Sequence, residues 1–378
     1  MHTAPTPHAN SPVLLPTTSI LAWLAASLVV AEVTKYSDLR LIVYAIPLLC
    51  LLWVTFDNSA ISVRRSPAIF VCVLFAAVIG SVVTANVYSV DALRHAVFLT
   101  MSIAMVWFYV PGGDKAAQWA LGVLSLGTFL LYAAGNAPAP SIAPYLFSNG
   151  FAESSYGLTA GAIAVYFYHR RNYLWLGLSG LATLVMYKRV AILALIIVIA
   201  ANELGVVRLL AASFWCRLLA AFLFLVVGLN VNAIALWFLD AFHIGGSIDA
   251  YMLGRYTYNA TLGHVIDSQS WLQQLLGNGP GAAERALSSE LGGKPVQPHN
   301  DFLRVRVDYG WIGLVALLAA TAALFDRGAL GAKLFLFQLI LFLTDNTLIY
   351  VFHFVVLSVL LGSVAPPVGR PSAPVRRA

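Results

Sequence analysis

Residues 298–325 read PHNDFLRVRVDYGWIGLVALLAATAALF. The part through Asp308 holds a histidine, two arginines and two aspartates, whereas residues 309–325 are almost wholly apolar. A helix needs roughly 20 apolar residues to cross the hydrocarbon core of a bilayer, and this run comes close to that length. The stretch therefore predicts a membrane-spanning helix with ionisable groups at its beginning. Such groups are costly to hold dry at a membrane edge, so they indicate a functional site.

The composition of the whole chain also indicates a membrane protein. Of its 378 residues, 60% are hydrophobic and 10% are charged, and the mean hydropathy is +0.83. Soluble domains carry about 25% charged residues. The net charge of +6 is modest and does not suggest nucleic-acid binding. Cys50, Cys72 and Cys216 lie far apart, without the spacing of a disulfide framework or a metal site.

Apolar runs of about spanning length recur along the chain. They cover residues 13–32, 39–56, 67–88, 93–110, 117–134, 154–169, 172–187, 189–203, 218–239, 309–325, 333–349 and 351–365. We therefore expect an all-α bundle of about twelve transmembrane helices. The expected parts are an N-terminal transmembrane bundle (1–239), an external loop subdomain (240–308), C-terminal transmembrane helices (309–365) and a disordered cytoplasmic tail (366–378).

The distribution of lysine and arginine predicts the orientation. With both termini in the cytoplasm, twelve of these residues lie on the cytoplasmic side and five lie near span ends on the other side. Five more fall in the long external loop, where charge counts little. A turn is expected at Lys188-Arg189, because residues 172–203 as one helix would measure about 48 Å, too long for a core of about 30 Å.

The long loop has its own predicted helices. Residues 250–276 suggest one amphipathic helix, which the glycines and proline of residues 277–281 must end. A short helix over 282–291 follows. Residues 303–309 alternate apolar and charged side chains, as a strand would, but Arg304 and Asp308 form an i,i+4 pair and favour a helix.

His299 is the first candidate for chemistry, since an imidazole can accept a proton near neutral pH. On position alone, a surface or capping role is the more common alternative. Asn300 and Asp301 are typical helix-start residues. Arg304 and Arg306 have two interpretations: they bind phosphate, or they pair with Asp308 and Asp301.

Two further basic positions stand at the edges of apolar runs. Arg189 has the fork needed to grip phosphate oxygens in pairs, although snorkelling to the interface is the alternative. For neighbouring Lys188, snorkelling is the favoured interpretation, and the alternative is that it supports the functional site. Arg255 is equally well interpreted as a phosphate ligand or as a solvated charge.

Several catalytic motifs are missing. The sequence has no P-loop, no paired Cys/His metal spacing, no GxSxG elbow and no Asp-rich nucleotide-sugar motif. Neither a metal nor another cofactor is expected. A donor carried by a lipid fits better than one activated by a nucleotide.

About 90 residues resemble the bacterial O-antigen ligase and polymerase superfamily, most strongly over 254–314. The matching elements are Gly254-Arg255, the turn Leu276-Gly277-Asn278-Gly279-Pro280-Gly281, and His299-Asn300-Asp301-Phe302-Leu303 followed by Tyr309-Gly310-Trp311-Ile312-Gly313. Residues 147–156 loosely resemble the family's Asn-Phe-Ala segment. In Tyr187-Lys188-Arg189 the family usually has Ser-Arg, so Tyr187-Lys188 departs from its pattern.

The resemblance implies a metal-independent, inverting glycosyltransferase of the bacterial inner membrane, with its site facing the periplasm. The donor would be a glycan on undecaprenyl diphosphate. Arg189 and Arg255 would approach each other and hold the diphosphate, and His299 would activate the acceptor hydroxyl. Asn300, Arg306 and Lys188 would support the site. Two arginines can neutralise a diphosphate leaving group without a metal.

Three assignments remain open. A ligase would transfer the glycan to lipid A-core, and the single dominant external loop favours it. A polymerase would instead join one lipid-linked repeat to another. A transporter or flippase of lipid-linked glycans is the alternative from a different class, although no inverted repeat is visible.

Overall fold

The computed structural model describes residues 62–63, 67–85, 90–109, 118, 121–122, 156–186, 188–243, 248, 252, 254–293, 296–326 and 328–363. The predicted spans at 13–32 and 39–56, nearly all of 117–134, residues 147–155 and the predicted tail lie outside these ranges. Within them the protein is all-helical, as expected, apart from a two-residue antiparallel pairing of β1 (Ser62–Val63) with β2 (Phe108–Tyr109).

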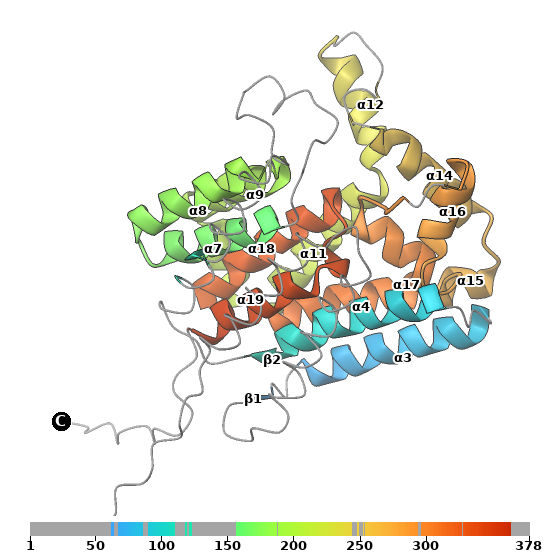
Figure 1. Ribbon diagram of the computed structural model, residues 1–378, viewed down its shortest axis with the longest axis horizontal. Coiled ribbons are helices and arrows are strands. Elements are labelled where there is room, and N and C mark those ends of the chain that lie inside the picture. Colours follow the sequence, from blue (N-terminus) through green and yellow to red (C-terminus); the bar gives the residue numbers. More distant parts are fainter. Residues whose placement is uncertain are drawn as a thin grey trace, which may run out of the picture.

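The helices of the described ranges fall into three groups (Figure 1). The central group is α17 (Asp301–Leu324), α18 (Gly328–Thr344) and α19 (Val351–Gly362), with the 3₁₀ turn η2 (Thr347–Ile349) before α19. The flanking group is α3 (Ala68–Ala85), α4 (Val90–Trp107), α7 (Tyr156–His169), α8 (Tyr173–Val185), α9 (Arg189–Glu203), α10 (Val206–Ala212), α11 (Phe214–Leu229) and α12 (Val231–Ala241). The third group, α14 (Arg255–Asp267), α15 (Trp271–Leu276) and α16 (Ala282–Glu290), gathers at one end.

The core is built around α17 and α18, which are buried along almost their whole length. α17 packs against α3, α11 and α15, and α18 packs against α9, α10 and α11. α7 is buried almost all round, whereas α3, α8, α9 and α11 bury one side and expose large apolar side chains on the other. Leu174, Leu204 and Trp215 are each more than 70% exposed. Apolar exposure on this scale suits a lipid environment and not water.

The number of membrane spans differs from the expectation. Among the described helices, only α3 and α17 are long and apolar enough to cross a bilayer alone. The pairs α9–α10, bent by 84°, and α11–α12, bent by 71°, raise the number to four if each pair is one span. Twelve spans are not confirmed. Within the predicted run 218–239, for example, α11 ends at Leu229 and α12 begins at Val231 after the bend of 71°.

The predicted break between α8 and α9 is confirmed, since α8 ends at Val185 and α9 begins at Arg189. The single helix predicted over 250–276 is wrong. α14 ends at Asp267, and Ser270 then caps α15. The Ser270 hydroxyl accepts from the Gln273 N–H, and the Gln273 side chain accepts from the Ser270 N–H. This reciprocal capping starts a new helix in the middle of the expected one.

α17 is a helix from Asp301 onward, as the Arg304–Asp308 spacing predicted, and it is broken once, at Gly310. The break leaves carbonyl groups open, and the glycine-rich turn satisfies them. Asn278 N–H donates to Val307 O at 2.8 Å, and Gly279 N–H donates to Asp308 O at 3.1 Å.

Glycines make this crossing possible. A Cβ at Gly277 would lie 2.2 Å from Asp308 O, and one at Gly310 would lie 2.3 Å from Leu275 O. Both glycines also have positive φ, at 84° and 66°. The turn therefore crosses α17 at backbone contact and fixes α14–α16 over the beginning of that helix.

Candidate functional site

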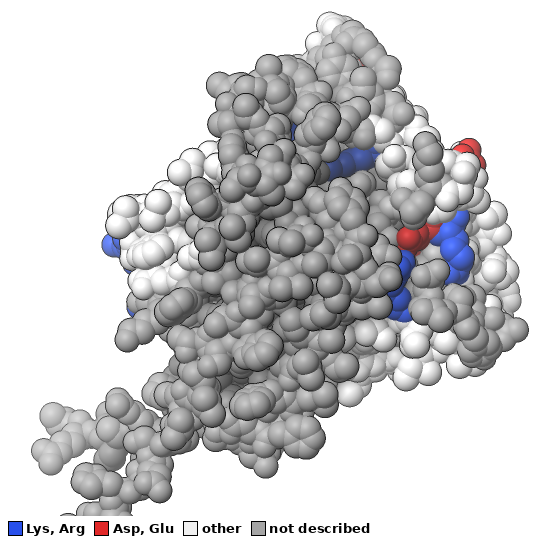
Figure 2. All heavy atoms as spheres, viewed as in Figure 1, with Lys and Arg blue, Asp and Glu red and all other residues white. Residues whose placement is uncertain are grey.

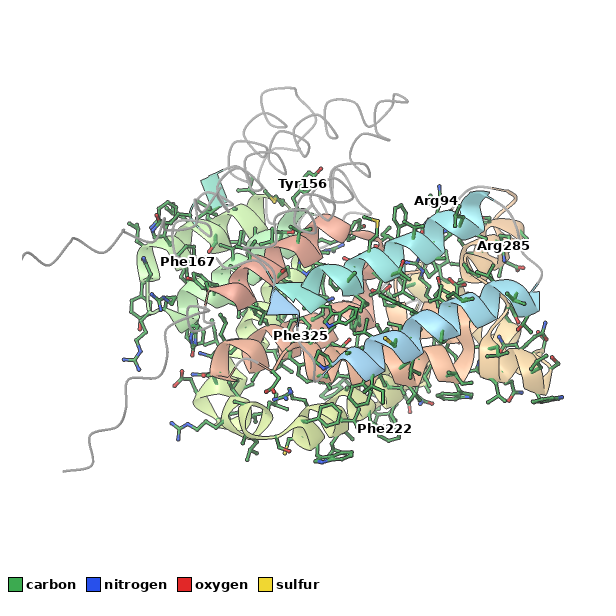
Figure 3. The ribbon with its side chains drawn as sticks, turned by 90° about the horizontal axis from the view of Figure 1, so that it is seen from below. Arg94, Tyr156, Phe167, Phe222, Arg285 and Phe325 are labelled. Atoms are coloured by element: carbon green, nitrogen blue, oxygen red, sulfur yellow. The ribbon has the colours of Figure 1, made fainter. Side chains whose placement is uncertain are left out.

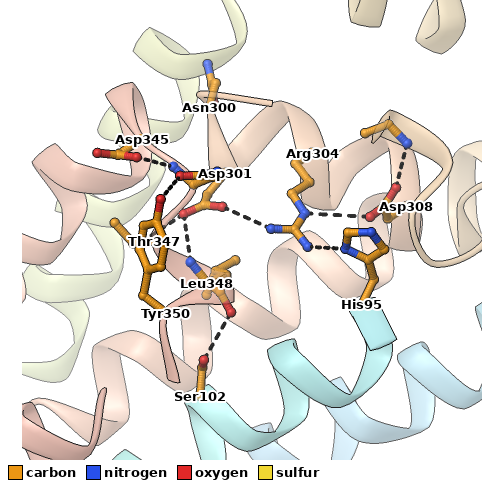
Figure 4. A network of polar contacts seen from close by, with 12 residues as sticks. His95, Ser102, Asn300, Asp301, Arg304, Asp308, Asp345, Thr347, Leu348 and Tyr350 are labelled. Atoms are coloured by element: carbon orange, nitrogen blue, oxygen red, sulfur yellow. Dashed lines mark hydrogen bonds and ion pairs between the residues drawn. The ribbon is translucent and has the colours of Figure 1, made fainter. Parts of the chain in front are cut away.

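The beginning of α17 is anchored by Asn300 and Asp301 (Figure 4). Asn300 Oδ1 accepts from the Leu303 N–H, which confirms its predicted capping role, and its Nδ2 donates to Gly228 O at 2.8 Å. The buried Asp301 carboxylate accepts from Thr347 Oγ1 at 2.8 Å and from Leu348 N–H at 3.2 Å. These bonds hold the helix start against α11 and η2.

His299 lies directly before this anchor and faces Asp345. Its Nδ1 is 4.0 Å from Asp345 Oδ1, and its side chain is 32% exposed. Asp345 lies in the break between α18 and α19 and is fully buried. Its Oδ1 accepts from the Asn346 N–H at 2.8 Å, and its Oδ2 pairs with Lys188 Nζ at 2.6 Å.

Lys188 is buried at the start of α9, so the favoured interpretation of interfacial snorkelling is wrong for this residue. The reason is the buried partner, because a desolvated carboxylate retains an ammonium group that would otherwise reach water. Gly157 in α7 makes room for it: a Cβ there would lie 2.5 Å from Lys188 Cβ.

This group of three, which we call the Lys188–Asp345–His299 cluster, has the arrangement of an oriented base. A carboxylate on the Nδ1 side favours the tautomer with its proton on Nδ1. The ring itself is one-third exposed. Such a ring can accept a proton from a hydroxyl group that approaches it.

A second group, which we call the Arg304 network, connects α17 to α4 and α16 (Figure 4). Arg304 Nη2 donates to His95 Nδ1 at 2.9 Å, and the guanidinium lies 3.9 Å from Asp301 and 3.8 Å from Asp308. The predicted Arg304–Asp308 pair is thereby confirmed. Asp308 also accepts from the N–H groups of Gly281 and Ala283, at the start of α16.

The network reaches the surface at Glu284. Because Arg304 can only donate, His95 Nδ1 must accept, and His95 Nε2 carries the proton that it donates to Glu284 Oε2 at 2.5 Å. Arg94 lies 3.4 Å from the same oxygen. Partial burial raises the pKa of the Glu284 carboxyl, but the bonds from His95 and Gln297 and the Arg94 charge together hold that pKa below its ordinary value.

Figure 2 shows basic and acidic side chains side by side on this part of the surface, where α4 meets α16. Figure 3 places Arg94 and Arg285 at the same end of the molecule. The charged surface and the beginning of α17 therefore belong to one end of the bundle.

The other predicted residues have separate places. Arg189 is half-buried and begins α9, next to Lys188. Arg255 is half-buried and begins α14 after Gly254, which has φ 79°. Their mutual approach stays a prediction. Arg306 is buried, donates to Gln269 Oε1 at 2.8 Å and stacks on Trp311, apart from the partners of Arg304.

Asp345, His95 and Glu284 were not among the site residues predicted from the sequence. His95 had a usable signal, because it is an ionisable residue inside the predicted span 93–110. Glu284 had none. Within the described residues, no group of three or more His, Cys, Asp or Glu side chains is placed to hold a metal ion.

Comparison with models of known protein families gives no match, and comparison with curated proteins gives none either.

Proposed function

We propose that the protein is a bacterial inner-membrane glycosyltransferase. It transfers a glycan from undecaprenyl diphosphate to an acceptor hydroxyl at the periplasmic face. The observation that carries the proposal is the Lys188–Asp345–His299 cluster, a partly exposed imidazole backed by a buried, charge-balanced carboxylate. The resemblance of residues 254–314 to O-antigen ligases and polymerases supports the same assignment.

In this proposal His299 is the general base. Its Nε2 takes the proton of the acceptor hydroxyl while the acceptor oxygen forms a bond to the anomeric carbon. The bond from that carbon to the phosphate oxygen breaks, and the diphosphate leaves with the electron pair. A single displacement of this kind inverts the anomeric configuration.

Asp345 and Lys188 are positioning residues. The Asp345 carboxylate lies on the Nδ1 side of the ring and stabilises the imidazolium that forms when Nε2 takes the proton. Lys188 neutralises Asp345 in the ground state, which keeps a buried carboxylate charged where it would otherwise be costly.

Arg189 and Arg255 hold the diphosphate. Arg189 is the residue after Lys188, so its backbone is fixed beside the cluster. Guanidinium groups bind phosphate oxygens in pairs and offset the charge that develops on the leaving group. Asn300 keeps His299 in place by capping α17.

The acceptor that fits the single dominant external loop is lipid A-core, which makes the protein an O-antigen ligase. Surface glycan analysis of a deletion strain tests this. Core that lacks any added glycan, with lipid-linked glycan accumulating in the outer leaflet, is the result for a ligase. Core that carries one repeat assigns the polymerase reaction, and accumulation in the inner leaflet contradicts an enzyme and favours a flippase.

A further inference from the structure

Arg306 is a buried cation without a carboxylate partner among the described residues. Its Nη1 donates to Gln269 Oε1 at 2.8 Å, and its guanidinium carbon lies 4.7 Å from the centre of the Trp311 ring. Buried arginines are normally paired with an acid. Arg304, two residues earlier on the same helix, has two aspartates within 4 Å and illustrates that ordinary case.

The donors around Arg306 exceed the acceptors. Arginine can only donate, so the Gln269 carbonyl oxygen faces Arg306 and the Gln269 NH₂ group faces elsewhere. Gln269 Nε2 and Arg306 Nε are both buried and meet no acceptor in the described part of the chain. An unmet buried donor costs roughly 1–3 kcal/mol. Two such donors beside an unpaired positive charge indicate an anionic acceptor.

The position of Arg306 relative to the apolar surface narrows the choice of anion. Trp271 is 72% exposed, and Trp311, Ile312 and Val315 are exposed on α17. Exposed tryptophans beside aliphatic side chains are typical of the membrane interface. The Arg306 guanidinium lies 4.7 Å from the centre of the Trp311 ring, so the two groups are at the same depth. Interfacial tryptophan rings lie at the level of the lipid headgroups, which makes a headgroup phosphate the anion within reach.

We propose that Arg306 and Gln269 bind the phosphate of a membrane lipid headgroup. The phosphate oxygens accept from the Arg306 guanidinium and the Gln269 amide, and Trp311 holds the guanidinium from its other face. Snorkelling does not explain the residue, because its head group is buried in protein and not in water. The proposal is independent of the glycosyltransferase assignment.

The test measures thermal unfolding of the full chain, purified in a maltoside detergent that contains no phosphate. One sample receives phosphatidylglycerol, a second a neutral diacyl glycolipid with the same acyl chains, and a third inorganic phosphate. We expect phosphatidylglycerol to raise the unfolding temperature, because a ligand bound only to the folded state stabilises it. An equal rise with the glycolipid, or the full rise with inorganic phosphate, overturns the assignment to a lipid phosphate.

Two variants and a control make the test specific. Arg306→Gln weakens phosphatidylglycerol binding by about tenfold or more, since a charged hydrogen-bond donor is lost. Gln269→Glu places a carboxylate beside Arg306, so the protein stays folded while the lipid-induced rise disappears. Arg285→Gln is the control: it removes an exposed arginine from α16, and the rise in unfolding temperature with phosphatidylglycerol stays. A rise that persists in Gln269→Glu contradicts the proposal.

Discussion

Asp345 connects three segments that are distant in sequence. Its carboxylate pairs with Lys188 at the start of α9 and faces His299 before α17, while it lies itself after α18. Burial removes the water that would otherwise satisfy both charges. Lys188 and Asp345 therefore depend on each other for stability, and His299 lies 4.0 Å from their carboxylate.

We expect Asp345→Asn to destabilise the protein by roughly 3–5 kcal/mol, because it leaves the Lys188 charge buried without its carboxylate. Replacing both residues with apolar ones, as in Lys188→Met with Asp345→Leu, should restore much of that stability but not glycan transfer. Thermal unfolding and a transfer assay on the same preparations separate the two effects. If Asp345→Asn alone were as stable as the unmodified protein, the Lys188–Asp345 pair would contribute nothing to stability.

Glu284 gives the folded state a dependence on pH. Its pKa is lowered in the folded protein, so its contribution to stability is fully present above the ordinary value of 4.5 and is lost as the pH falls below that value. The difference in unfolding temperature between the unmodified protein and Glu284→Gln should therefore shrink as the pH falls from 6 to below about 4. Glu290→Gln, at an exposed position of the same helix, is the matched control.

Among single residues, the cap at Asn300 and the Arg304–Asp308 pair were predicted from the sequence, while the role of His299 stays a prediction. All of them stand at the edge of an apolar run, where any polar group is noticeable. The partners of these residues were harder to predict. Asp345 and His95 come from other helices, and only the packing of α17 between them brings the groups together.

At the scale of elements, the junction between the glycine-rich turn and α17 positions the external helices. The sequence predicted that residues 277–281 end a helix, which is a local property of glycine and proline. It did not predict that this turn supplies the N–H groups for the carbonyls at the Gly310 break. That contact joins segments about 30 residues apart, and no local pattern encodes it.

Gly277→Ala tests this junction against a matched control. Gly277 and Gly293 share a φ of 84°, but a Cβ at Gly293 meets nothing within 4 Å. Gly293→Ala should cost about 1–2 kcal/mol from the left-handed backbone alone. Gly277→Ala should cost about 4 kcal/mol or more, because its backbone at φ 84° and ψ 179° suits glycine alone and the Cβ also collides with the backbone of α17. Equal losses of unfolding free energy would contradict the junction.

The capping box at Ser270 shows why the single helix predicted over 250–276 was wrong. The residues Ser270 to Gln273 carry the capping signal, but apolar spacing on both sides of it gave the appearance of one helix. In the same region, the predicted helix over 282–291 agrees with α16 to within one residue.

For the whole molecule, the composition predicted an all-helical membrane protein, and helix content and apolar helices support that coarse description. The number of spans was overestimated within the described ranges because helices bend and end inside apolar runs. The predicted orientation puts the starts of α9 and α17 and the end of α18 on the same side of the membrane. In agreement with it, these three helix ends meet at the Lys188–Asp345–His299 cluster.

We predict that α16 and the C-terminal tail lie on opposite sides of the membrane. In a variant with Cys50, Cys72 and Cys216 replaced, an impermeant thiol reagent applied to spheroplasts should label Ser288→Cys at once. It should label Ser372→Cys, which lies outside the described residues, only after the membrane is opened. Labelling of both positions in intact spheroplasts would exclude this orientation.

The transfer rate of His299→Gln in proteoliposomes tests the central claim most directly. Glutamine retains a hydrogen-bonding side chain but cannot take a proton at neutral pH, and loss of a general base costs about 10²–10⁴-fold in rate. We predict a loss of that size with an unchanged unfolding temperature, because the His299 ring is partly exposed. His264→Gln, at an exposed position on α14, should transfer at the unmodified rate. An unmodified rate in His299→Gln would contradict the assignment of His299 as the base.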